Sequence, residues 1–142
     1  MPLYKRLAAI LLSLVLVGSM ICIPAAAFSD VTEDMWFAES VSYVQDHGLF
    51  RGIDDTMFAP DAVMTRAMFV TVLCRADCSQ NGSYPDSGFI DAPSGEYYAT
   101  AVNWGKSTGL VNGISDTTFE PDTPVSREQI CTLFYRYIQY LD

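Results

Sequence analysis

The sequence predicts an all-α protein built from two tandem helix–loop–helix repeats. Three observations lead to this prediction. The chain matches itself at an offset of 61 residues, which places Gly48 on Gly109. Apolar residues in each copy recur at helical spacing and end at that glycine. Thr65 and Ser126, also at equivalent positions, are good N-caps for a second helix in each copy.

The repeat is the strongest of these signals, because internal periodicity defines the fold before any other feature. Aligning residues 28–75 with 89–136 gives 16 identical pairs over 48 positions without a gap. We divide the chain into repeat 1 (28–76), a linker (77–88) and repeat 2 (89–142). One copy alone buries little apolar surface, so we expect the two copies to share a core.

Residues 1–27 are typical of a secretory signal peptide. Lys5 and Arg6 precede an uncharged apolar stretch at 7–23, and the small residues 25–27 form a cleavage site. The alternative is a transmembrane anchor, but 17 apolar residues are at the short end of what spans a bilayer. We expect export and cleavage after residue 27.

Charge and cysteine content exclude several classes of function. After cleavage, 6 basic and 17 acidic residues remain, a net charge of −11, which disfavours nucleic acid and anionic membranes as partners. His47 is the single histidine and is expected on the surface, and no Cys-x-x-Cys pair exists, so a metal site is not expected. Cys74 and Cys131 fall at core-like positions, while a Cys74–Cys78 disulfide is an alternative for Cys74.

The first helix of repeat 1 is predicted from Phe37, Val41 and Val44, which lie on one helical face. Gly48 stands where a left-handed residue would end the helix, and Leu49 follows as the apolar residue of a Schellman motif. The equivalent glycine and leucine in repeat 2 predict the same helix end.

The segment 52–61 that follows is rich in Gly, Asp and Pro and is expected to form a structured loop. Phe58 and its equivalent Phe119 are expected to pin this loop onto the core. A calcium-binding loop is the alternative interpretation of its acidic residues, but the EF-hand spacing is absent. These acidic residues are Asp54, Asp55 and Asp61.

The second helix starts after Thr65 in repeat 1 and after Ser126 in repeat 2. Ser126 and Gln129 have the spacing of a capping box, whereas Met68 in repeat 1 cannot return the second hydrogen bond. An apolar stripe follows each start. The stripes are Phe69, Val72, Leu73 and Ala76 in repeat 1, and Ile130, Leu133, Phe134 and Tyr137 in repeat 2.

These motifs, in this order and twice, resemble the S-layer homology (SLH) repeat. The matching pieces are Phe28-Ser29-Asp30-Val31, Trp36-Phe37-Ala38, Gly48-Leu49-Phe50-Arg51-Gly52, Asp55-Thr56-Met57-Phe58-Ala59-Pro60 and Thr65-Arg66-Ala67-Met68, with their counterparts in repeat 2. The resemblance implies non-covalent attachment to bacterial cell walls through secondary cell-wall polysaccharide, often pyruvylated, or peptidoglycan. It also implies a pseudo-threefold unit of three repeats, of which two repeats would form an incomplete bundle.

Two arginines are the leading binding candidates. Arg66 and Arg127 are the first residues of their helices, where a cation opposes the helix dipole. An anionic ligand held by the guanidinium and the free helix N–H groups would compensate. The alternative is an ion pair with Asp61 or Asp122, five residues upstream.

Aromatic residues near the first helices are the second group of candidates. Trp36 and Tyr97 are either flat faces for sugar rings or core residues, and Tyr43 and Trp104 are expected in the core. Asp30 and Asp91 are expected to be turn or cap residues. The predicted polysaccharide-binding residues are Arg66, Arg127, Thr65, Ser126, Gln129, Trp36 and Tyr97.

The sequence therefore predicts a secreted, non-catalytic wall-anchoring module at a bacterial surface, with no cofactor. One alternative is a protein–protein assembly module that completes a three-repeat unit with a further SLH repeat from a partner chain. A wall-glycan hydrolase is a weaker alternative, because His47 has no nucleophile and acid arranged with it as a catalytic set.

Overall fold

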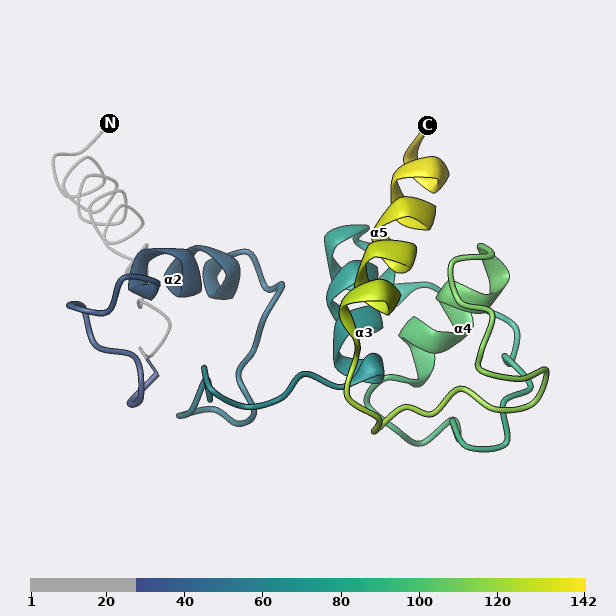
Figure 1. Ribbon diagram of the computed structural model, residues 1–142, viewed down its shortest axis with the longest axis horizontal. Coiled ribbons are helices and arrows are strands. Elements are labelled where there is room, and N and C mark those ends of the chain that lie inside the picture. The colour runs from purple at the N-terminus through teal and green to yellow at the C-terminus, as the bar shows by residue number, and fades with distance from the viewer. Residues whose placement is uncertain (1–27) are drawn as a thin grey trace, which may run out of the picture.

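A computed structural model describes residues 28–142, so the predicted signal peptide lies outside the described part. That part is all-α, with four α-helices, one short 3₁₀ helix and no strand (Figure 1). The elements are α2 (Ala38–Asp46), α3 (Arg66–Ala76), η1 (Ser79–Asn81), α4 (Ala99–Ser107) and α5 (Arg127–Leu141). Within residues 28–142, no helix has the length and apolar character that crossing a membrane requires.

Glycine ends α2 in the predicted way. Gly48 has a φ of +67°, and its N–H donates to the carbonyl of Gln45 at 2.8 Å. The Leu49 N–H donates to the carbonyl of Val44 at 2.9 Å, which completes a Schellman motif. Gly109, with a φ of +77°, repeats the left-handed turn after α4.

The N-caps of the second helices are also confirmed. Thr65 Oγ1 accepts a hydrogen bond from the Met68 N–H at 3.3 Å. Ser126 Oγ accepts from the Gln129 N–H at 3.4 Å, and Gln129 Oε1 accepts from the Ser126 N–H at 3.3 Å. The full capping box therefore forms only in repeat 2, because Met68 has no acceptor to return.

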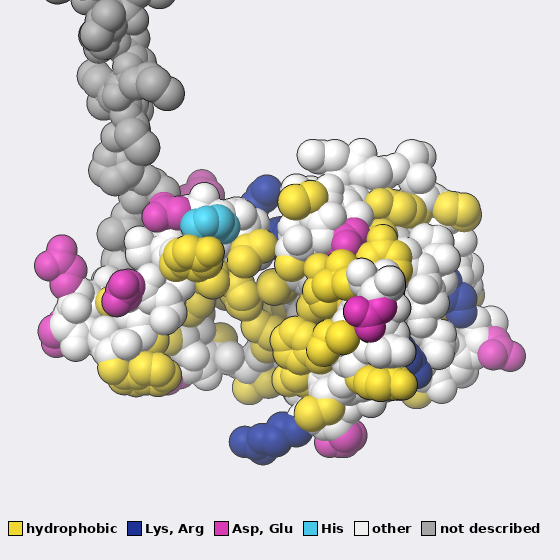
Figure 2. Space-filling model, turned by 90° about the horizontal axis from the view of Figure 1, so that it is seen from above, with side chains coloured by type: hydrophobic (Ala, Val, Ile, Leu, Met, Phe, Trp, Pro, Cys, Tyr) yellow, Lys and Arg dark blue, Asp and Glu magenta, His cyan; other side chains and the backbone are white. Residues whose placement is uncertain are grey.

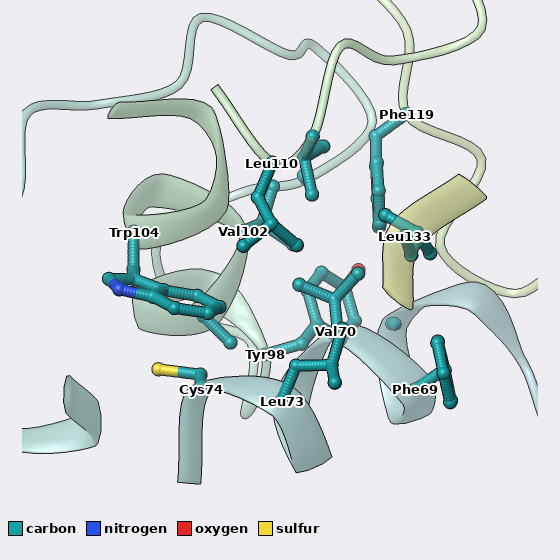
Figure 3. Close-up of a cluster of buried hydrophobic side chains, with 14 of the residues drawn as sticks. Phe69, Val70, Leu73, Cys74, Tyr98, Val102, Trp104, Leu110, Phe119 and Leu133 are labelled. Atoms are coloured by element: carbon teal, nitrogen blue, oxygen red, sulfur yellow. The ribbon is translucent and has the colours of Figure 1, made fainter. Parts of the chain in front are cut away.

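The main core joins the second helix of repeat 1 to the first helix of repeat 2. Helices α3 and α4 pack against each other, and Figure 3 shows Trp104 from α4 lying against Cys74 from α3. Side chains of α5 close the cluster, with the Phe134 ring 5.2 Å from the Phe69 ring. The buried members are Ala67, Phe69, Val70, Leu73, Cys74, Phe89, Ala92, Tyr98, Ala101, Val102, Trp104, Leu110, Val111, Phe119 and Leu133.

Helix α2 lies apart from this cluster and contributes nothing to it (Figure 1). Trp104 is fully buried, as predicted, but its equivalent Tyr43 is 60% exposed, so the prediction of a core role for Tyr43 is wrong. The reason is topological: α3 covers the face of α4 that carries Trp104, whereas no described helix precedes α2 to cover Tyr43.

The same asymmetry corrects the predicted face of α5. Leu133 of α5 is buried. Phe134 is 45% exposed, although its equivalent Leu73 lies in the core, and Cys131 is exposed, although its equivalent Val70 lies in the core. Cys74 is buried as expected, and Cys74, Cys78 and Cys131 are all free thiols. The alternative Cys74–Cys78 disulfide is therefore not formed.

The segment between the repeats packs on the helices that it joins. Its helix η1 contacts α3 and α4, and the Ser87 N–H donates to Asn103 Oδ1 at 2.9 Å. Tyr84 packs on the core cluster. This segment therefore holds α3 and α4 together at their ends.

Candidate functional site

Two carboxylates hold the loops that border the candidate site. Asp30 accepts hydrogen bonds from the Phe58 and Ala59 N–H groups at 2.8 and 2.7 Å. Asp91 accepts equivalent bonds from Phe119 and Glu120 at 2.8 and 2.7 Å. Consecutive N–H groups can form an anion-binding nest, and in both repeats the chain's own carboxylate fills it.

The nest explains an unusual backbone conformation. Ala59 and Glu120 have φ values of +58° and +59°, a region that non-glycine residues rarely adopt. Asp54 stabilises the first of these loops further, because Oδ1 accepts from the Thr56 and Met57 N–H groups. Of the acidic loop residues, Asp54 thus binds backbone N–H groups, and no group of three potential metal ligands occurs among residues 28–142, which gives the calcium interpretation no support.

Two grooves lie at equivalent places in the two repeats. Each runs between the turn that follows the first helix and one side of the second helix. Groove 1, of about 340 Å³, is lined by Phe50, Arg51, Gly52, Ile53, Phe58, Ala59, Pro60, Ala62, Val63, Met64, Met68, Thr71, Val72, Arg75 and Tyr97. Groove 2, of about 200 Å³, is lined by Arg66, Val111, Asn112, Gly113, Ile114, Glu128, Gln129, Thr132, Leu133 and Arg136.

Groove 1 combines two cations with apolar walls. Arg51 and Arg75 line it, and no carboxylate does. Burial lowers the pKa of Arg75, and repulsion from the Arg51 charge lowers it further. An anionic group placed between these guanidinium groups would relieve that repulsion.

Arg75 also fixes the shape of the groove. Its Nη1 donates to the carbonyl of Leu49 at 3.0 Å, and Arg136 donates to Leu110 at 3.2 Å in repeat 2. Each arginine thereby ties the second helix to the glycine turn at the end of the first. Neither was predicted as a site residue, although their match at the 61-residue offset was a signal that could have identified them.

Tyr97 comes from repeat 2 but lines groove 1, so this groove lies between the repeats. Its ring is 60% exposed, which excludes the core role for Tyr97. Burial of its hydroxyl raises the pKa of Tyr97, which a hydrogen bond with Thr65 and the charge of Arg75 oppose. Thr65 and Tyr97, both predicted site residues, are therefore neighbours.

Trp36 is not a core residue either, because 93% of its surface is exposed. It lies over a separate open hollow of about 680 Å³, together with Asp30, Asp34 and Asp61. The acidic surroundings differ from those of groove 1, and they are unsuited to an anionic ligand.

Groove 2 contains Arg66 and Gln129, two further predicted residues. Arg66 is only 7% exposed, and its Nε donates to the Phe119 carbonyl at 3.0 Å. Burial lowers the pKa of Arg66, while the charges of Glu120 and Asp91 oppose this shift. The alternative ion pair with Asp61 is wrong, because Arg66 points into the loop of the other repeat.

Arg127 and Ser126 complete the predicted set. Arg127 is exposed and lines neither groove, and its side chain has no hydrogen bond or ion pair with any other residue in 28–142. Ser126 is engaged in the capping box. The structure thus divides the predicted residues among groove 1, groove 2 and exposed positions outside them.

Comparison with known protein families identifies the family to which these repeats belong. The model of the S-layer homology domain matches residues 27–68 and 89–131, one match for each repeat. The chain belongs to the S-layer homology domain family. Grooves 1 and 2 are therefore equivalent hollows of two SLH repeats, and η1 lies in the segment between the two matches.

Three of the curated relatives of this SLH chain are named as surface-layer, cell-surface or anchoring proteins. It is 28% identical to the Surface-layer 125 kDa protein of Lysinibacillus sphaericus over 125 residues, which are 81% of this chain and 10% of that protein. It is 26% identical to the Cell surface protein of Thermoanaerobacter kivui over 145 residues, or 97% of this chain and 19% of that protein. It is 28% identical to the Cellulosome-anchoring protein of Acetivibrio thermocellus over 116 residues, or 79% of this chain and 26% of that protein. The chain thus spans only a tenth to about a quarter of the length of these relatives.

Proposed function

We propose that this SLH chain is a non-catalytic anchoring module that binds an anionic cell-wall polymer at a bacterial surface. The names of these three relatives, a surface-layer protein, a cell-surface protein and an anchoring protein, support this location. Export through the predicted signal peptide would bring the module there. Two repeats would form part of the pseudo-threefold bundle that the family resemblance implies.

The observation that carries the proposal is the charge of groove 1. The whole chain has a net charge of −9, yet this groove holds Arg51 and Arg75 and is lined by no carboxylate. A protein with 17 acidic residues has to exclude them locally to bind an anion. The groove is lined mainly by apolar side chains, which suits a carbohydrate ring bearing one charged substituent.

We assign separate tasks to the groove residues. Arg51 and Arg75 would bind a carboxylate, such as the pyruvyl ketal of a secondary cell-wall polysaccharide, or a phosphate. Tyr97 would stack on the adjoining sugar ring, and Thr65 would hold the Tyr97 hydroxyl. Groove 2 would be a second, smaller contact that uses Arg66, Arg136 and Gln129, with Glu128 reducing its affinity for anions.

Co-sedimentation with purified wall sacculi, before and after the wall polymer is stripped, tests the proposal. The exported protein should sediment with intact sacculi and stay in solution with stripped ones. Arg51→Ala should abolish most of this binding without unfolding the protein, because Arg51 is exposed and forms no hydrogen bond with any described residue. Arg75 is unsuitable as the main variant, because it also holds Leu49.

Arg127→Ala is the matched control, because it removes one exposed positive charge outside both grooves. It also tests the sequence-based prediction that Arg127 contacts the polymer. Equal loss of binding in the two variants would mean that groove 1 is not the specific site, because net charge or Arg127 itself would then account for the binding. Failure of the unaltered protein to sediment with intact sacculi would contradict wall anchoring by this chain.

A further inference from the structure

The first half of repeat 1 forms a unit of its own beside the main core. We call residues 28–63 the α2 unit. Its buried hydrophobic side chains are Phe28 and Val41, and the Phe28 and Phe58 rings lie 5.5 Å apart within it. No residue of this unit belongs to the main core cluster, and Figure 1 shows α2 set apart from α3, α4 and α5. A unit that buries so little apolar surface depends on its contacts with the core for its order.

Groove 1 is the seam between the α2 unit and the core. One wall comes from residues within 50–63, and the other comes from α3 and from Tyr97 of repeat 2. Figure 2 shows hydrophobic side chains along the hollow beside the lobe of the α2 unit, while acidic side chains gather on the outer side of this lobe. Arg75 Nη1 donates across the seam to the Leu49 carbonyl at 3.0 Å. A ligand in groove 1 would therefore contact both the α2 unit and the core.

The two walls of groove 1 carry like charges. Arg51 is on the wall of the α2 unit and Arg75 is on α3. Burial lowers the pKa of Arg75 and the charge of Arg51 lowers it further, so the two guanidinium groups repel each other across the seam. A bound oxyanion would replace this repulsion by attraction from both walls. Anion binding and closure of the seam should therefore favour each other.

Tyr97 offers a third donor, which comes from repeat 2. Its hydroxyl forms a hydrogen bond with Thr65, whose Oγ1 also accepts from the Met68 N–H at 3.3 Å. If Thr65 donates its own hydrogen to the Tyr97 oxygen, the Tyr97 hydrogen is available to a ligand in the groove. Burial raises the pKa of Tyr97, so the hydroxyl keeps this hydrogen at neutral pH, and the opposing effect of the Arg75 charge indicates that this guanidinium is near.

We propose that groove 1 is an anion clamp, in which the Tyr97 hydroxyl joins Arg51 and Arg75 in binding one oxyanion, and the bound anion holds the α2 unit against the core. The ligand is a phosphate or carboxylate group, which presents several oxygens to these donors. Thr65 does not line the groove and is a positioning residue, because it orients the Tyr97 hydroxyl. The clamp rests on the wall-binding function proposed above for its natural ligand and adds that engagement of the polymer orders the α2 unit.

Hydrogen exchange with inorganic phosphate as the probe tests the clamp. Exchange of the α2 amides should slow by about tenfold when phosphate is present at about ten times its dissociation constant. Amides of α4 should not change, because α4 packs on α3 in the main core. Sodium chloride at the same ionic strength is the control for general salt effects, and pyruvate in place of phosphate distinguishes a carboxylate from a phosphate ligand. Unchanged α2 exchange with both phosphate and pyruvate would overturn the clamp.

Removal of one hydroxyl separates donation by Tyr97 from stacking by its ring. Tyr97→Phe keeps the ring and its edge contact with the buried Tyr98, at 5.0 Å between centroids, so the variant should fold. It should bind phosphate about tenfold more weakly, because a donor to a charged group is lost. Tyr135→Phe is the matched control, because Tyr135 is 65% exposed on α5 and lines neither groove. Equal phosphate affinity of the Tyr97 variant and the unaltered protein would contradict the donor role.

Arg51→Gln provides a test in which the order of two proteins should reverse. Without phosphate, the α2 amides of the variant should exchange more slowly than those of the unaltered protein, because the repulsion from Arg75 is removed. With saturating phosphate, the unaltered protein should be the more protected of the two, because only it has both cations of the clamp. The same order under both conditions would overturn the proposed coupling between the anion and the seam.

These measurements use no wall material, so the clamp and the wall-binding proposal can fail separately. Protection of α2 by phosphate, together with failure to sediment with sacculi, would support the clamp and exclude the wall polymer as its natural ligand. Sedimentation that Tyr97→Phe does not weaken, together with unprotected α2 amides, would support wall anchoring and overturn the clamp.

Discussion

Arg66 in repeat 1 donates its Nε–H to the carbonyl of Phe119 in repeat 2 at 3.0 Å, and its guanidinium lies over the Phe119 ring. A charged side chain at the start of α3 therefore holds the loop of the other repeat. The same residue type at Arg127 is exposed and holds nothing in residues 28–142. The two arginines occupy one motif position but perform different tasks.

Removal of Arg66 should destabilise the fold far more than removal of Arg127. Arg66→Ala leaves the carbonyl of a buried residue without its donor and removes the contact with the ring, a loss of about 2 kcal/mol. Arg127→Ala should change the free energy of unfolding by less than about 0.5 kcal/mol. Urea unfolding followed by circular dichroism measures both, and similar midpoints would contradict a structural role for Arg66.

Trp104 and Tyr43 form a matched pair in the two repeats. Trp104→Ala should cost about 3–5 kcal/mol, because the side chain is fully buried between α3 and α4. Tyr43→Ala should cost less than about 1 kcal/mol, because the ring is mostly exposed. Thermal unfolding of the two variants provides the comparison, and a large loss of stability for Tyr43→Ala would show that α2 packs on the core.

Two carboxylates, Asp30 and Asp91, should make the protein less stable at acidic pH. Hydrogen bonds from the Phe58 and Ala59 N–H groups lower the pKa of Asp30. Partial burial raises the pKa of Asp91, but the bonds from Phe119 and Glu120 outweigh it and leave a lowered pKa. A carboxyl with a lower pKa in the folded state stabilises the protein above its unfolded pKa, about 4, and loses this contribution as the pH falls through the folded value.

Asp91→Asn tests this dependence. The variant should be less stable at neutral pH, because the amide binds the two N–H groups more weakly than the carboxylate does. Its unfolding midpoint should then change less between pH 6 and about 3 than that of the unaltered protein. A pH profile parallel to that of the unaltered protein would show that Asp91 contributes nothing to acid sensitivity.

The cysteines should differ in reactivity. Burial raises the pKa of Cys74 to about 11, with the charge of Asp77 adding to the shift, so little thiolate forms near neutral pH. Cys78 and Cys131 are exposed and should react with iodoacetamide at pH 8, while Cys74 should react only in urea. Mass spectrometry of the alkylated peptides measures the order, and early modification of Cys74 would show that α3 and α4 separate readily.

Much of the local structure could be predicted because its causes are local. A glycine in the left-handed conformation ends a helix, and a Ser or Thr side chain that accepts a hydrogen bond from the N–H group three residues later begins one. Both effects act through hydrogen bonds between residues close in the sequence. The Gly48 turn and the Ser126 capping box were confirmed for that reason. The candidate site was predicted less well, since Arg51 and Arg75 become neighbours only when the turn after α2 meets α3.

Spacing along the chain was sufficient to predict the repeat, the helix ends and the family. That the core joins α3 to α4 across the repeats, so that Trp104 is buried and Tyr43 is exposed, is seen only in the fold. The fold also explains why Arg66 binds the Phe119 carbonyl while Arg127 has no partner within residues 28–142. Equal sequence positions have equal propensities, but burial depends on which element packs nearby, and among residues 28–142 α3 and α4 pack on each other whereas no described helix packs on α2 in the same way.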